Sequence, residues 1–208
     1  MEDFYKTVLK EAQDEFTEKR SRFIGYCKPV KTEQEAVAFI NEKRSIHWDA
    51  THNVYAYVLK EGNSQRYSDD SEPQGTAGVP TLDVIRKSGV VDCVVVVTRY
   101  FGGVLLGAGG LVRAYSHGAR IALDAANIIT MENCFCCSVS MSYNQYGKVS
   151  TLIPQSEGVI DESFFTDDVK IHFHIAKANL PVLQKKLKDA TSGEIIPEIL
   201  EEKFFIKP

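Results

Sequence analysis

A glycine-rich segment, residues 99–116, carries the residue types in this chain that are best suited to bind an anion. It follows the β-branched run 94–98, which predicts a strand buried on both faces, and it precedes a helical pattern. The free backbone N–H groups at the start of a helix, together with the helix dipole, form a site for negative charge. The predicted anion-binding or nucleic-acid-binding residues here are Arg99, Tyr100, Gly102, Gly103, Gly107, Gly109, Gly110 and Arg113.

The glycine spacing does not match either of two common phosphate-binding motifs. Gly102 and Gly107 are spaced as in a G-x-x-x-x-G loop, but the Lys-Ser or Lys-Thr pair that such a loop needs does not follow. A dinucleotide fingerprint starting at Gly107 would need glycine or alanine where Val112 stands. On pattern alone, the glycines serve equally well to turn the backbone and to let the helix approach the sheet.

Residues 66–78 form a second unusual segment, with three carboxylates within four positions followed by small residues. Carboxylate oxygens suit a hard cation such as Mg²⁺, and they can also position a water as general base. An acidic, solvated turn is the more common use of such a stretch, so no metal site and no cofactor is assigned, with Mg²⁺ as the only candidate. No catalytic residue is assigned either. We expect this segment and the glycine-rich segment to line one cleft of the first domain. The candidate cleft residues are His52, Arg66, Asp69, Asp70, Glu72 and Thr76.

Other polar residues give weaker signals. Lys185 and Lys186 belong to a basic cluster on the last predicted helix, which is the best candidate for phosphate contact in the second half of the chain. His172 and His174 share a strand face, but no third zinc ligand has a suitable spacing. Ser116 is followed directly by a histidine, and neighbouring helix residues point about 100° apart, which disfavours a nucleophile–base pair.

The order of the predicted elements indicates two α+β domains. Alternating patterns predict strands over 21–30 and 52–60, and Thr32 can cap a helix between them. From Asn133 onward the predicted order is β-α-β-β-α-β, which is that of a ferredoxin-like unit. We therefore expect an N-terminal domain over residues 1–135 and a C-terminal domain over residues 136–208.

Composition limits the class of protein. The 208 residues are 44% apolar, no apolar run reaches membrane-spanning length, and the first residues lack the features of a signal peptide. The five cysteines are odd in number and form no C-x-x-C pair, which is typical of reduced thiols. We expect a cytoplasmic protein. The net charge of −4 disfavours non-specific coating of nucleic acid, so any such contact requires a local basic face.

Several motifs in fixed order resemble those of the Impact family, in its bacterial YigZ-like branch. They are Ser-Arg-Phe-Ile-Gly from residue 21, His-Asn-Val-Tyr-Ala-Tyr from 52, Arg-Tyr-Ser-Asp-Asp from 66, Glu-Pro at 72, Gly-Thr-Ala-Gly from 75, and the segment from Arg99 to Tyr115. The resemblance covers essentially the whole chain, and its motifs together are far more specific than a single glycine loop.

The resemblance implies a fold for each domain. The N-terminal domain is expected to resemble the second domain of ribosomal protein S-five, a β-sheet with helices on one face. The C-terminal domain is expected to resemble the last, ferredoxin-like domain of elongation factor G.

The resemblance also implies a regulator of translation that binds nucleic acid or the ribosome, since eukaryotic members act in the stress response to amino-acid starvation. Their N-terminal partner-binding domain has no counterpart before residue 21, so that protein partner is not carried over. The alternative is an enzyme acting on a phosphorylated small molecule, with a galactokinase-type fold and Mg²⁺ held by Asp69, Asp70 and Glu72. Catalysis is the less favoured expectation. The predicted partners are RNA or the ribosome, with a protein partner in translation control as a further candidate. No membrane partner is predicted, and the oligomeric state is left open.

Overall fold

The computed structural model describes residues 3–207 and divides into two compact units. The N-terminal unit is Tyr5–Thr130, and the C-terminal unit contains residues 131–207 together with residues 3–4. Strand β7 (Ile128–Met141) belongs to both, because the division falls within it, five residues before the boundary expected from the sequence. The two sheets and five helices of the described residues give the α+β, two-domain architecture that the sequence predicts.

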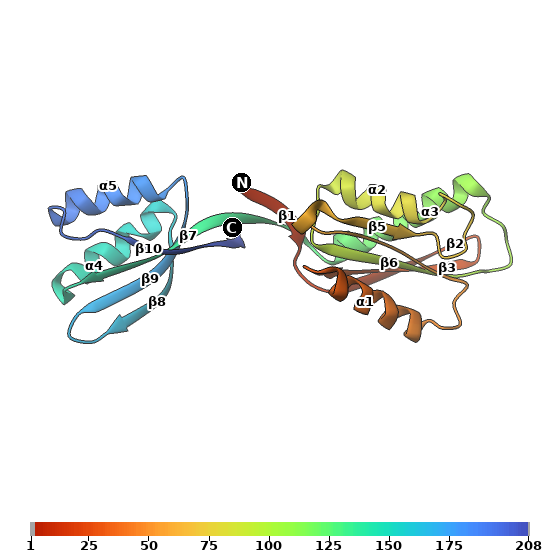
Figure 1. The fold of residues 1–208 in the computed structure, drawn as a ribbon, viewed down its shortest axis with the longest axis horizontal. Coiled ribbons are helices and arrows are strands. Elements are labelled where there is room, and N and C mark those ends of the chain that lie inside the picture. Colours follow the sequence, from red (N-terminus) through yellow and green to blue (C-terminus); the bar gives the residue numbers. More distant parts are fainter. Residues whose placement is uncertain (1–2, 208) are drawn as a thin grey trace. The chain divides into compact units, whose positions relative to one another are not determined.

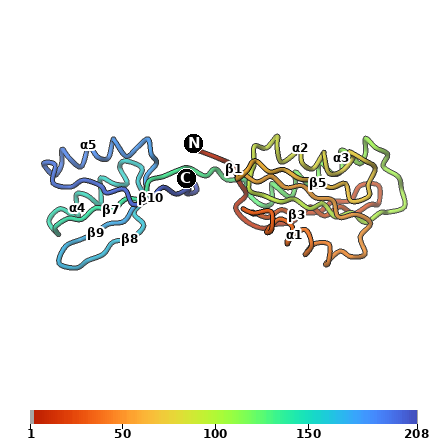
Figure 2. The backbone as a smooth tube through the Cα atoms, in the orientation of Figure 1, coloured from red at the N-terminus to blue at the C-terminus, as the bar shows by residue number. Residues whose placement is uncertain are grey.

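The N-terminal unit is built on a five-stranded antiparallel sheet in the order β2-β3-β6-β4-β5 (Figures 1 and 2). Its central strand, β6, contains four consecutive valines that are fully buried, which explains the continuous β-branched run in the sequence. Strand β1 (Phe4–Val8) has its first residue in the C-terminal unit and the rest in this one. The other elements of this unit are β2 (Ala12–Glu18), β3 (Ser21–Pro29), α1 (Glu33–Ile46), β4 (His52–Val58), η1 (Glu61–Asn63), β5 (Gln65–Ser68), α2 (Gly78–Ser88), β6 (Cys93–Tyr100) and α3 (Ala108–Ala125).

Helices cover both faces of this sheet. Helices α2 and α3 pack on one face, where Val95 and Val97 of β6 meet Ile85 and Tyr115 in the larger core. Helix α1 packs on the opposite face over Val96 and its neighbours. The fold expected from the sequence has helices on one face only, which is true of α2 and α3, but α1 covers the other face. Strands β3, β4 and β6 carry apolar side chains on both faces, so both faces need a covering helix.

Helix α3 approaches the sheet closely because glycines face each other across the contact. A Cβ at Gly25 of β3 would lie 2.2 Å from the carbonyl oxygen of Gly118 in α3. The helix begins after Gly107, whose φ of 72° lies in the left-handed region that other residues rarely adopt. These glycines fix where the N-terminus of α3 lies relative to the end of β6.

The C-terminal unit has the β-α-β-β-α-β order predicted from the sequence. Its sheet contains β10, β7, β9 and β8 side by side, all antiparallel, and β1 also pairs with β7. Phe173, Leu183 and Leu187 are fully buried in its core. No helix among residues 3–207 is long and apolar enough to cross a membrane. The remaining elements are α4 (Tyr143–Leu152), η2 (Pro154–Ser156), β8 (Val159–Phe165), β9 (Val169–Ala176), α5 (Leu180–Thr191) and β10 (Glu198–Ile206).

Candidate functional site

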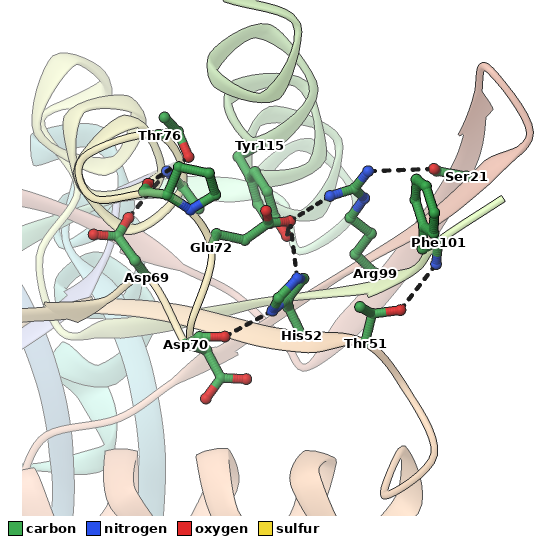
Figure 3. Close-up of polar contacts among 12 residues, drawn as sticks. Ser21, Thr51, His52, Asp69, Asp70, Glu72, Thr76, Arg99, Phe101 and Tyr115 are labelled. Atoms are coloured by element: carbon green, nitrogen blue, oxygen red, sulfur yellow. Dashed lines mark hydrogen bonds and ion pairs between the residues drawn. The ribbon is translucent and has the colours of Figure 1, made fainter. Parts of the chain in front are cut away.

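A buried carboxylate, Glu72, lies at the centre of a polar cluster in the N-terminal unit (Figure 3). It stands in the loop between β5 and α2, and its side chain is only 3% exposed. Its Oε1 accepts hydrogen bonds from Arg99 Nη1 of β6 at 2.6 Å and from the Tyr115 hydroxyl of α3 at 2.7 Å. Arg99 Nη2 in turn lies 3.5 Å from Ser21 Oγ of β3. One carboxylate thus connects three segments that are far apart in the sequence.

The electrostatics of this cluster keep Tyr115 a hydrogen-bond donor. Burial, and after it the charge of Glu72, raise the pKa of the Tyr115 phenol far above its ordinary value of 10.0. The charge of Glu72 is balanced by Arg99, which is itself buried. A buried ion pair of this kind depends on good geometry, because both groups have given up hydration.

His52, at the start of β4, faces the same carboxylate. Its Nδ1 lies 2.7 Å from the backbone carbonyl oxygen of Asp70, and because a carbonyl oxygen only accepts, Nδ1 carries a proton. The other ring nitrogen, Nε2, lies 3.6 Å from Glu72 Oε1, beyond hydrogen-bond distance. The imidazole is therefore held in place from the loop side, with Nε2 directed toward Glu72.

The remaining residues of the acidic segment have structural partners. Asp69 accepts hydrogen bonds from the backbone N–H groups of Gly75, Ala77 and Gly78, and so it caps the first turn of α2. Asp70 accepts from the Asn53 N–H at 2.6 Å and pairs with Arg44, while the Thr76 hydroxyl donates to the carbonyl of Pro73.

The three carboxylates of this segment therefore bind partners on different elements and do not converge. Among residues 3–207, no group of three acidic, histidine or cysteine side chains could hold a metal ion. The Mg²⁺ arrangement considered from the sequence has no geometric support.

The acidic segment and the glycine-rich segment meet in one cleft of about 400 Å³. His52, Glu72 and Arg99 form its polar part, and the start of α3 forms its edge. The lining residues are Thr51, His52, Ser71, Glu72, Pro73, Arg99, Phe101, Leu105, Leu106, Gly107, Ala108 and Leu111.

The helix N-terminus at this edge has no side-chain cap. No side chain of residues 3–207 accepts a hydrogen bond from the first turn of α3, and the first intrahelical bond runs from the Leu111 N–H to the Gly107 carbonyl. The backbone N–H groups of Ala108, Gly109 and Gly110 precede that bond, as the free donors of a helix start do. The glycines before and within α3 thus do two things: they let the helix pack closely on the sheet, and they leave its N-terminus open.

A second hollow, a groove of about 460 Å³, lies along the other flank of α3. Leu106 lines both the groove and the cleft, so the start of α3 lies between them. Lys19 and Arg113 are the cations that line the groove, His117 lines it as well, and Glu18 is its one carboxylate. Lys19 and Arg113 make no ion pair with any described residue.

The next residue in the β2–β3 turn, Arg20, extends this basic surface. The Arg20 backbone lies so close to the glycine turn that a Cβ at Gly102 would come within 2.0 Å of its carbonyl oxygen. Like Lys19 and Arg113, Arg20 has no ion-pair partner within residues 3–207. We refer to Lys19, Arg20 and Arg113 below as the basic patch.

Several predicted site residues lie elsewhere. The Tyr100 hydroxyl contacts His47 and Asp49, so this side chain points to the α1 side of the sheet. Arg66 lies on the edge strand β5 and does not line the cleft. Lys185 and Lys186 belong to α5 in the C-terminal unit, where Lys186 Nζ donates to the backbone carbonyl at position 155.

Some residues of the cluster were not predicted as site residues. The helical pattern places Tyr115 on a buried face, but no sequence pattern indicates its contact with Glu72, which lies 43 positions earlier. Ser21 opens one of the family motifs, and its Oγ receives the Gly102 N–H as well as lying near Arg99. The β2–β3 turn carries two adjacent basic residues, which was the available signal for the basic patch.

Comparison with known proteins places these residues in a recognised domain. Residues 19–123 match the Impact N-terminal domain, and residues 139–194 match a domain of unknown function (DUF1949). Over 191 residues the chain is 36% identical to the IMPACT family member YvyE of Bacillus subtilis, covering 91% of this chain and 88% of that protein. The chain belongs to the Impact family. The Glu72 cluster, the cleft and the basic patch all lie within its Impact N-terminal domain.

Other Impact-family members and one solved structure are similar over different lengths. The Escherichia coli member YigZ is 34% identical over 187 residues, covering 88% of this chain and 92% of that protein. Bos taurus Protein IMPACT is 38% identical over 96 residues, which cover 44% of this chain and 30% of that protein. A crystal structure described as a hypothetical protein matches with a TM-score of 0.61 at 30% identity, covering 98% of this chain and all of the other.

Proposed function

We propose that this Impact-family protein is a cytoplasmic regulator of translation that binds RNA, either free or in the ribosome, through the basic patch and the adjoining start of α3. The observation that carries the proposal is the grouping of three unpaired cations beside an uncapped helix N-terminus. Phosphate groups bind both features, since free N–H groups and the helix dipole favour an anion and the cations release its counterions.

The charge distribution supports a local contact. The whole chain carries a net charge of −4, so an RNA is repelled by most of the surface and attracted only where cations lack acidic partners. Arg99 was expected to bind phosphate, but it is buried and its charge is neutralised by Glu72. The exposed Arg113 is the arginine of the glycine-rich segment that is free to contact phosphate.

The proposal predicts a weak, salt-dependent interaction. Three cations contacting a single strand give a slope of log K against log salt of about −2. Replacing Lys19, Arg20 and Arg113 by glutamine should remove that slope and weaken binding roughly 100-fold at 0.1 M salt. Fluorescence anisotropy with labelled single-stranded and hairpin RNAs measures both quantities, and co-sedimentation with ribosomes tests the assembled form.

The matched control replaces three exposed lysines outside the patch, Lys10, Lys87 and Lys170, which also lack ion pairs in the described part of the chain. This variant has the same net charge as the patch variant. If both variants lose RNA binding equally, the interaction is general electrostatics and the patch has no special role. If wild-type protein binds neither RNA nor ribosomes above a control protein, the proposed function is wrong.

A further inference from the structure

The cleft beside the patch contains a hydrogen-bond acceptor that the protein leaves unused. Both hydrogen bonds to Glu72 go to Oε1, and Oε2 receives none from any described residue, although the side chain is 97% buried. Oε2 is not among the fully buried side-chain atoms without a partner in residues 3–207, so this oxygen opens onto the cleft. Because Glu72 lines the cleft, a molecule entering the cleft can supply the missing donor.

His52 adds a second acceptor at the same place. Its Nδ1–H donates a hydrogen bond to the Asp70 carbonyl oxygen. In a neutral imidazole with this tautomer, Nε2 carries a lone pair and accepts hydrogen bonds. This nitrogen lies 3.6 Å from Glu72 Oε1, beyond hydrogen-bond distance. A hydroxyl placed at this point can donate to one of these groups and remain in contact with the other.

The charge balance selects a neutral donor over an ammonium group. Arg99 already neutralises Glu72 at 2.6 Å within the buried cluster. A second cation would leave an uncompensated positive charge beside the positive end of α3. A hydroxyl supplies the hydrogen bond without that charge.

The rest of the cleft suits an anion and a flat apolar group. The start of α3, at Gly107 and Ala108, offers free N–H groups to an anion. Arg99 Nε is also buried and has no hydrogen-bond partner within the described chain. Phe101 and Leu105 line the cleft and are 44% and 81% exposed, which leaves apolar surface available for a ring to cover.

We propose that the cleft binds one ribonucleotide unit, with the ribose 2′-hydroxyl at Glu72 Oε2 and His52 Nε2, the adjoining phosphate at the N-terminus of α3, and the base against Phe101 and Leu105. This deepens the proposed function and rests on it where the nucleotide belongs to an RNA chain. It makes the protein selective for RNA over DNA, since the 2′-hydroxyl is the group that distinguishes them.

The test compares RNA with DNA of the same sequence. Wild-type protein should bind the RNA about tenfold more tightly, the usual size of one hydrogen bond to a charged group. Glu72→Gln should bring this ratio close to one by changing the acceptor, and His52→Gln provides a second variant if the first fails to fold. Glu61→Gln, at an exposed carboxylate in η1, removes the same charge and is the control for a change of charge.

A different variant, Ala108→Glu, tests the phosphate end of the proposed site. Ala108→Glu adds a carboxylate to the first turn of α3, which favours the helix through its dipole but repels a phosphate. It should weaken binding of RNA and DNA alike, by about tenfold, and leave their ratio unchanged. Thermal unfolding at or above the wild-type temperature would show that the fold is intact.

A nucleoside monophosphate and its 2′-deoxy form, titrated in a thermal-shift assay, distinguish the two sources of the ligand. Stabilisation by the ribose form alone supports a free or terminal nucleotide, whereas a ribose preference seen only with oligonucleotides supports a unit within an RNA chain. Equal binding of ribose and deoxyribose forms in both assays would overturn the inference and leave the proposed function intact. Loss of all nucleic-acid binding would overturn the proposed function, and the mononucleotide arm would then decide the inference by itself.

Discussion

Breaking the Glu72–Arg99 pair should destabilise the N-terminal unit far more than removing an exposed arginine. Arg99→Met removes the donor at 2.6 Å and leaves the Glu72 carboxylate 3% exposed with only the Tyr115 hydroxyl as partner. The loss of one member of a buried pair costs about 3–5 kcal/mol, because the remaining charge stays buried without compensation. Arg113→Met, at an exposed and unpaired site, should cost less than about 0.5 kcal/mol.

Successive replacements then test whether the cost arises from the stranded charge. Adding Glu72→Leu to Arg99→Met removes that charge but leaves the buried Tyr115 hydroxyl without its acceptor, which costs about 1–3 kcal/mol. Adding Tyr115→Phe removes this group as well, so the triple variant should recover to within about 1 kcal/mol of wild type.

Urea unfolding, followed by circular dichroism and by amide exchange in peptides from β6, measures these free energies for the N-terminal unit. If Arg99→Met costs no more than Arg113→Met, the pair is not buried as described and the reasoning fails. A triple variant as unstable as Arg99→Met would show that the loss is one of packing.

Three further predictions concern other parts of the chain. Asp69→Ala should expose the amides of Ala77 and Gly78, where α2 begins, to faster exchange and cost about 1 kcal/mol, whereas unchanged exchange would contradict the capping role. Gly102→Ala should lower the unfolding temperature, since its Cβ would lie 2.0 Å from the Arg20 carbonyl oxygen, and a neutral result would exclude that close approach. Burial raises the pKa of Cys137 to about 11, so its thiol should resist alkylation at pH 8; because the native state holds this proton more tightly, stability should fall as pH rises from about 9 to about 11.

The order of elements could be predicted wherever the hydrophobic period was strong. In the C-terminal unit β9 spans Val169–Ala176 and α5 begins at Leu180, as the alternating and helical patterns indicate. Strands β2 and β5 were missed because they are short edge strands with few buried side chains, so no alternation marks them. In α3 the three-residue spacing of Val112 and Tyr115 predicts one buried face for both, yet Val112 is 38% exposed, since the buried stripe is set by the close contact of Gly118 with β3.

The candidate site was only partly predictable, because its chemistry depends on long-range pairing. The sequence indicated that the acidic and glycine-rich segments share a cleft, and the lining of the cleft includes residues of both. It did not indicate that Arg99 and Glu72, 27 positions apart, neutralise each other, which removes Arg99 as an exposed phosphate ligand. Nor could it separate Asp69, a helix cap, from Glu72, because both are carboxylates in the same short segment.

The most direct test of RNA binding at the start of α3 is to follow the backbone amide signals of Ala108, Gly109 and Gly110 by NMR during titration with RNA. The account predicts that these three signals shift in a saturable way, together with the side-chain signal of Arg113, and that the shifts fade as salt is raised. Shifts confined to other surfaces, with these amides unchanged at saturating RNA, would contradict it.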